Sequence, residues 1–323
     1  MVDTQKSKKD KGLMFTAWQM VLLSRPVHWV KNLAIFAALI FSGNLFEEGL
    51  LVKLFWGFIV FNFATSAIYI FNDILDAKSD SLHPIKKNRP LAAGYVDKTL
   101  ALAISLLFAF IAVYWSSALG LLFFLLVVTY LVLQVLYSLA LKNIPIIDIL
   151  IIAAGFIIRV FAGAFVVDAH LSVWFLLCVI SVALFLASGK RRAELNTVGA
   201  SGATRKSLTK YSRDALNSYV TMFGNAAWMS WSLFTFFESP KASLPIWLFL
   251  AELSRTTTIN KLLMITIPVV IFGIMRYESL IFAGKSEAPE KLFLTDKSLV
   301  VSVLMWTGLV VWIIYSGVSV QTF

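Results

Sequence analysis

The sequence predicts an all-α membrane protein with about nine transmembrane helices. Of its 323 residues, 59% are hydrophobic and only 14% are charged, and the mean hydropathy is +0.82. Soluble domains average about 45–50% apolar and about 25% charged residues. The apolar residues form continuous runs of about 20 residues, the length of a helical span. A membrane β-barrel would instead show alternating segments of about 10 residues.

The chain divides into a basic N-terminal tail, residues 1–23, and one polytopic catalytic domain, residues 24–323. No signal-peptide cleavage site follows the tail. The expected spans lie at residues 30–46, 51–71, 99–116, 118–139, 146–167, 171–188, 215–236, 259–282 and 298–318. The single cysteine, Cys178, excludes an intrachain disulfide.

Lysine and arginine gather in alternate connections between these segments, as at Lys6, Lys86, Lys142, Lys190 and Lys291. The positive-inside rule then puts the N-terminus and the even-numbered connections in the cytoplasm. We therefore expect a multi-pass protein of the inner (plasma) membrane whose active site faces the cytoplasm. The same excess explains the net charge of +10 without a nucleic-acid partner. Two cytoplasmic loops, residues 72–98 and 189–214, carry the charged motifs.

Three carboxylates follow the second apolar segment, in the stretch 72–80 (NDILDAKSD). If the helix continues, spacings of three and four residues place Asp73, Asp76 and Asp80 on one face. Their mutual repulsion near a low-dielectric bilayer is relieved when a divalent cation binds between them. Mg²⁺ binds through one or two carboxylates together with substrate phosphate oxygens. The motif predicts a catalytic Mg²⁺ site that includes Asn72, and the alternative is a solvated acidic helix end.

A basic stretch, residues 83–90 (HPIKKNRP), follows directly. Its two prolines exclude a regular helix, so Lys86 and Arg89 are expected on a rigid loop beside the acidic site. Such cations neutralise diphosphate charge. Other candidates for phosphate binding are Lys31, Lys142, Arg159, Lys190 and Arg191, with membrane anchoring as the alternative. Arg159 should face a polar cavity, because an unpaired guanidinium inside the membrane costs at least about 2.5–3.5 kcal/mol.

These motifs resemble the UbiA superfamily of intramembrane prenyltransferases. The pattern N-D-x-x-D-x-x-x-D followed by H-P-x-K-x-x-R-P-x-A-x-G, at residues 72–94, is similar to the first motif of that superfamily. The resemblance extends to Arg25-Pro26, to Tyr137-Ser138 and to Arg159. It implies a UbiA-type helical bundle with its active site at the cytoplasmic side.

Residues 189–196 (GKRRAELN) are basic where aromatic prenyltransferases of this superfamily carry a second acidic motif. This stretch is similar to the decaprenyl-phosphate phosphoribosyltransferase branch. The resemblance implies Mg²⁺-dependent transfer of 5-phosphoribosyl from phosphoribosyl diphosphate to a polyprenyl phosphate, with release of diphosphate. It also places Tyr137 and Glu194 near the substrate phosphates, and it implies a role in making cell-envelope glycolipid or arabinan precursors.

Two other functions compete with phosphoribosyl transfer: prenyl transfer and transport. Prenyl transfer to an aromatic acceptor is disfavoured by the basic second motif. A transporter is disfavoured because the acids cluster at a helix end, whereas transporters place them near mid-membrane. The sequence leaves a homo-oligomer open.

Overall fold

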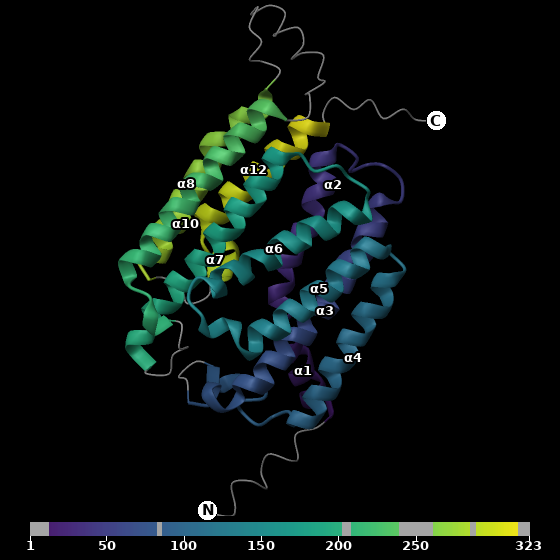
Figure 1. Cartoon of the computed structure of the whole chain (residues 1–323), viewed down its shortest axis with the longest axis vertical. Helices are drawn as coiled ribbons and strands as arrows, with labels where there is room; N and C mark the ends of the chain where they lie inside the picture. The colour runs from purple at the N-terminus through teal and green to yellow at the C-terminus, as the bar shows by residue number, and fades with distance from the viewer. Residues whose placement is uncertain (1–12, 83–85, 202–207, 239–260, 285–288, 316–323) are drawn as a thin grey trace, which may run out of the picture.

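The structure is a computed structural model that describes residues 13–82, 86–201, 208–238, 261–284 and 289–315, and every regular element there is a helix (Figure 1). The α-helices are α1 (Leu13–Ser24), α2 (Ala37–Ser42), α3 (Leu50–Asp80), α4 (Lys98–Ser117), α5 (Leu121–Leu139), α6 (Ile147–Val166), α7 (Val173–Ser201), α8 (Arg213–Phe237), α10 (Ile267–Phe282), α11 (Pro289–Thr295) and α12 (Lys297–Tyr315). The 3₁₀ helices are η2 (Pro26–Phe36), η3 (Lys86–Asn88), η4 (Leu141–Asn143), η5 (Leu208–Lys210) and η7 (Leu262–Thr266).

Seven helical segments in the described ranges are long and apolar enough to cross a membrane. They are α3, α4, α5, α6, the first 24 residues of α7, η7 with α10, and α12. The predicted span 30–46 corresponds to a shorter apolar segment, Pro26–Ser42, which comprises η2 and α2. The predicted span 215–236 corresponds to α8, which has 25 residues. The helical membrane architecture is confirmed, and the count of nine spans stays a prediction.

Helix α6 lies between two groups of helices (Figure 1). On one side α3 packs against α4 and α5, around the buried rings of Phe61, Phe123 and Tyr130. On the other side α7 packs against α8, and α10 packs against α12, around Phe175 and Trp231. Because α6 contacts both α5 and α7, it joins the two groups and can anchor residues from either one.

The 3₁₀ helix η2 packs directly on the backbone of α6. A Cβ on Gly163 would lie 1.9 Å from the carbonyl oxygen of Ile35, so only glycine permits this approach. With 3.0 residues per turn, a 3₁₀ helix keeps residues i and i+3 in line, and runs longer than three or four residues are uncommon. The eleven residues of η2 therefore hold a fixed face toward α6.

Helix α7 continues without a break from Val173 to Ser201. The prediction of a loop beginning at residue 189 is therefore wrong. The charged stretch 189–196 is helical, since none of its residues after Gly189 disfavours a helix strongly. Its side chains consequently point in different directions around the α7 axis.

Candidate active site

The acidic motif occupies the last turns of α3. This helix has 31 residues, so it is about 46 Å long, whereas the hydrocarbon core of a bilayer is about 30 Å thick. A helix that spans the core therefore has several turns outside it. Asp73, Asp76 and Asp80 lie in those final turns, as the sequence predicted.

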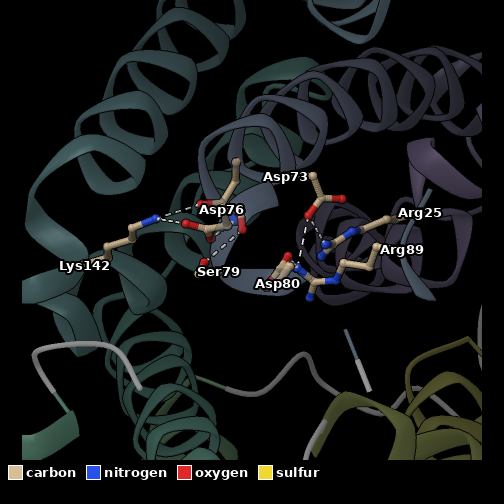
Figure 2. A network of polar contacts seen from close by, with 8 residues as sticks. Arg25, Asp73, Asp76, Ser79, Asp80, Arg89 and Lys142 are labelled. Carbon is tan, nitrogen blue, oxygen red and sulfur yellow. Dashed lines mark hydrogen bonds and ion pairs between the residues drawn. The ribbon is translucent and has the colours of Figure 1, made fainter. Parts of the chain in front are cut away.

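The three carboxylates divide into two sets of contacts (Figure 2). Asp73 and Asp80 are buried, and both accept hydrogen bonds from the Arg89 guanidinium, at 3.1 Å in the case of Asp73. Asp76 pairs instead with Lys142 Nζ at 2.7 Å and accepts a hydrogen bond from Asn72 Nδ2 at 2.9 Å. Within the described residues, no three carboxylate, imidazole or thiol side chains converge as a ready metal site.

The donor set nevertheless suits Mg²⁺. Arg89 places one cationic nitrogen between the oxygens of Asp73 and Asp80, which shows that these two carboxylates can share a cation. Mg²⁺ usually takes one or two protein carboxylates and completes its shell with water and phosphate oxygens. Asp73, Asp76 and Asp80, in the last turns of α3, would hold the ion directly or through its water ligands.

Arg25 joins this cluster, although we did not predict it as a site residue. Its guanidinium pairs with Asp73 and lies 5.1 Å from the Tyr69 ring centre. Its backbone is left-handed, at φ 53° and ψ 59°, a conformation that costs an L-residue about 1–2 kcal/mol. The Arg25-Pro26 pair in the superfamily resemblance was the available signal. The contact itself joins residues 48 positions apart, which spacing along a helix cannot predict.

Lys86 begins η3, and its carbonyl accepts the Arg89 N–H at 3.0 Å. This turn directs the Arg89 side chain back to α3. The structure thus brings Asn72, Arg89 and Lys142 to the carboxylates.

Arg191 lies in a different, fully buried network. Its Nε is 2.7 Å from Asp148 Oδ2 at the start of α6, and both side chains are completely buried. Its other nitrogens donate to Glu194 and to the Tyr137 hydroxyl. The Tyr211 hydroxyl donates to Asp148 at 2.8 Å, and burial raises the pKa of Tyr211, which keeps this proton in place. Arg191 therefore joins Tyr137, Glu194 and Asp148 in one buried network.

Arg159 is also buried, but its partners are neutral. Nε donates to Asn32 Oδ1 at 2.6 Å, Nη1 to the Gly155 carbonyl at 2.6 Å, and Nη2 to the Tyr130 hydroxyl at 3.0 Å. Asn32 in turn donates to Asn62 Oδ1 at 2.7 Å. The polar surroundings of Arg159 are therefore side chains of η2 and α5 and a carbonyl of its own helix, α6.

An apolar cavity of about 490 Å³ lies between η2, α6, α7, α10 and α12. Along α7 it extends from Phe175 to Lys190, about 22 Å at 1.5 Å per residue. Among the described residues, Lys31 and Lys190 are the two cations that line the cavity. Lys190 is the last of the α7 residues that line it. Lys31 is six residues after Arg25, so the cavity begins about 12 Å along η2 from the acidic cluster.

A cluster of carboxylates and cations at the end of α3 and an elongated apolar cavity in the same helical bundle fit a membrane-embedded transferase. The chain belongs to the UbiA prenyltransferase family, whose profile matches residues 32–255. The resemblance seen in the sequence is thereby confirmed.

Two curated relatives are similar over most of their length. The decaprenyl-phosphate phosphoribosyltransferase of Corynebacterium glutamicum is 33% identical over 97% of this chain and 91% of its own. The decaprenyl-phosphate phosphoribosyltransferase of Mycolicibacterium smegmatis is 32% identical over 88% of each chain. Among solved structures, a UbiA homolog from Archaeoglobus fulgidus bound to GPP and Mg²⁺ superimposes with a TM-score of 0.65 at 15% identity, over 94% of this chain and 100% of its own. That likeness shows the shared fold.

Proposed function

We propose that the protein transfers 5-phosphoribosyl from phosphoribosyl diphosphate to a polyprenyl phosphate and releases diphosphate. The observation that carries the proposal is the apolar cavity of about 490 Å³ lined by Lys31 and Lys190, together with the carboxylate and arginine cluster about 12 Å away along η2. A lipid phosphate needs an apolar channel for its tail and cations for its head. The names of the two curated relatives support a polyprenyl phosphate acceptor and phosphoribosyl as the transferred group.

In this reaction a phosphate oxygen of the lipid forms a bond to C1 of the ribose while the bond from C1 to the diphosphate breaks. The lipid phosphate is already anionic at neutral pH, so the step needs no general base. Arg25, Arg89 and Lys142 lie where they would bind the negative diphosphate, and the two cavity lysines would bind the acceptor phosphate. Catalysis then rests on positioning and on charge stabilisation.

Mg²⁺ held by Asp73, Asp76 and Asp80 would neutralise charge on the leaving diphosphate. We expect Asp73→Ala and Asp76→Ala to abolish Mg²⁺-dependent turnover while the protein stays folded, because each removes a carboxylate from the metal site. Asp80→Ala should be milder, since Mg²⁺ accepts water in place of one carboxylate. Turnover and thermal unfolding of the purified variants check this. Near-normal turnover of either of the first two variants in EDTA would contradict the metal site.

Prenyl transfer to an aromatic acceptor remains the competing reaction, because an apolar cavity also suits a prenyl diphosphate. In the described part of α7, however, the one acid of the second motif, Glu194, pairs with Arg191. This pairing leaves no second acidic cluster there for another metal ion.

The deciding experiment compares donors. Mg²⁺-dependent binding of phosphoribosyl diphosphate and of geranylgeranyl diphosphate should be measured on the same purified protein. We expect binding of the first and transfer of its labelled ribose to decaprenyl phosphate. Tight binding of geranylgeranyl diphosphate with none of phosphoribosyl diphosphate would overturn the proposal and leave the family assignment intact. We place the reaction at the cytoplasmic side of the plasma membrane, where the basic connections are expected.

A further inference from the structure

Each lysine of the cavity has an anchored residue as its next neighbour in the chain. Lys31 is followed by Asn32, which is fully buried and bonded to Arg159 of α6. Lys190 is followed by Arg191, which is fully buried and paired with Asp148 of α6. One helix, α6, therefore holds both elements that carry the lysines.

The 3₁₀ geometry of η2 explains how an anchor at Asn32 sets the direction of Lys31. Residues three apart lie in line on such a helix. Lys31 and Ala34 of η2, followed by Ala37 at the start of α2, form the edge that lines the cavity. Asn32 and Ile35 form the edge buried against α3 and α6. The buried edge is fixed by two hydrogen bonds of Asn32, one accepted from Arg159 and one donated to Asn62. The contact of Gly163 with Ile35 also fixes it.

Neither arginine lines the cavity itself. Phe156 lines the cavity, and its ring centre is 5.6 Å from the guanidinium carbon of Arg159. Arg191 is completely buried, and its nitrogens face Asp148, Glu194 and Tyr137. A lipid phosphate in the cavity would meet the lysines, and the arginines would act behind them.

We infer that Arg159 and Arg191 are positioning residues: they fix Lys31 and Lys190, through α6, as the subsite for the phosphate of the lipid acceptor. The inference rests on the proposed function, because it names the acceptor subsite of that reaction. The sequence suggested both arginines as phosphate ligands. In this inference they hold the lysines in place and do not contact the substrate.

Double-mutant cycles test this assignment. Binding of decaprenyl phosphate is measured without donor or metal for Lys31→Gln, Lys190→Gln, Arg159→Gln, Arg191→Gln and their pairs. Each lysine change should weaken binding roughly tenfold or more, the effect of a lost charge-assisted hydrogen bond. Arg159→Gln should match Lys31→Gln and add nothing to it, because it acts through Lys31. The effects of Arg159→Gln and Lys190→Gln should be independent and multiply. Arg191→Gln should match Lys190→Gln and add nothing to it, and its effect should multiply with that of Lys31→Gln.

Kinetics separate positioning from general damage. Arg159→Gln should raise KM for the lipid while KM for the donor and kcat change little. Arg159→Lys keeps the charge but cannot reproduce the guanidinium bond to Asn32, so it should remain impaired. If either glutamine variant fails to fold, Asn32→Ser and Tyr137→Phe remove one bond of each anchor and enter the same cycles. Inorganic phosphate should not displace the lipid, because the tail provides much of the binding.

Independent effects of Arg159→Gln and Lys31→Gln, or full binding by Arg159→Lys, would overturn the inference. Either result would show Arg159 contacting the phosphate itself or having no part in its binding. Absence of decaprenyl phosphate binding by the unmodified protein would overturn the proposed function, and the inference with it.

Discussion

At the scale of single residues, the least replaceable charge pair is Arg191 with Asp148. Both side chains are completely buried, at a separation of 2.7 Å. Removing one partner of such a pair leaves the other charge without compensation, at a cost of about 3–5 kcal/mol. We expect Asp148→Asn to lower the unfolding temperature in detergent by the largest amount of any substitution in the Arg191 network.

The matched control is Arg276→Gln, which breaks an ion pair to Asp296 that is partly exposed to solvent. Exposed pairs contribute about 0–1 kcal/mol, so this variant should unfold near the normal temperature. Equal unfolding temperatures for the two variants would show that the Arg191 network contributes no more than a surface pair.

Most residues around the carboxylates could be predicted from the sequence, because their chemistry was visible there. Acids at helical spacing beside a proline-bounded basic stretch indicated Asp73, Asp80 and Arg89. The pairing of Arg25 with Asp73 could not be predicted, since it depends on how α1 and η2 return to α3. Burial of Arg191 was missed for a similar reason: a basic run looks like one charged surface until the helix directs each side chain differently.

At the scale of elements, the central feature is the close contact between η2 and α6. We expect Gly163→Ala to displace η2, because the new Cβ would lie 1.9 Å from the Ile35 carbonyl oxygen, a backbone atom that cannot rotate away. Such overpacking costs about 1–3 kcal/mol. Thermal unfolding and decaprenyl phosphate binding should both weaken, because Lys31 moves with η2.

Gly57→Ala is the control for this change. Its Cβ would meet Phe123 at 3.5 Å, an ordinary contact, within the long helix α3. Alanine also favours a helix over glycine by about 1 kcal/mol, so this variant should be as stable as the unmodified protein or more so. If Gly163→Ala behaves in the same way, the contact between η2 and α6 is not tight in the membrane.

The elements themselves were predictable where apolar runs were long, as in α3 to α6 and in α12. The 3₁₀ form of η2 was not, because its geometry follows from Gly163 and the Asn32 contacts and not from local preference. The continuation of α7 past Lys190 could not be predicted, because a run of charges after an apolar segment indicates the end of a membrane span. In fact the Arg191 and Arg192 charges are satisfied by Asp148 and Asn217 inside the fold.

At the scale of the whole molecule, the arrangement around α6 explains how one membrane protein combines a polar cluster with an apolar cavity. The α3 group supplies the carboxylates, the α7 group supplies most of the cavity, and α6 anchors both lysines. This arrangement requires the acidic end of α3, η3 and the start of α4 to lie at one membrane surface. The positive-inside rule predicts that this surface is cytoplasmic.

Cysteine labelling tests that orientation. Cys178 is buried and is replaced by serine first. Ser81→Cys then places a thiol beside the acidic end of α3, and Ser117→Cys places one at the far end of α4, 20 residues long and about 30 Å from end to end. Both positions are exposed, so accessibility depends on the side of the membrane. In intact cells a membrane-impermeant thiol reagent should label Ser117→Cys and not Ser81→Cys, and after permeabilisation it should label both. The opposite pattern would turn the active site outward and refute a cytoplasmic supply of the phosphoribosyl donor.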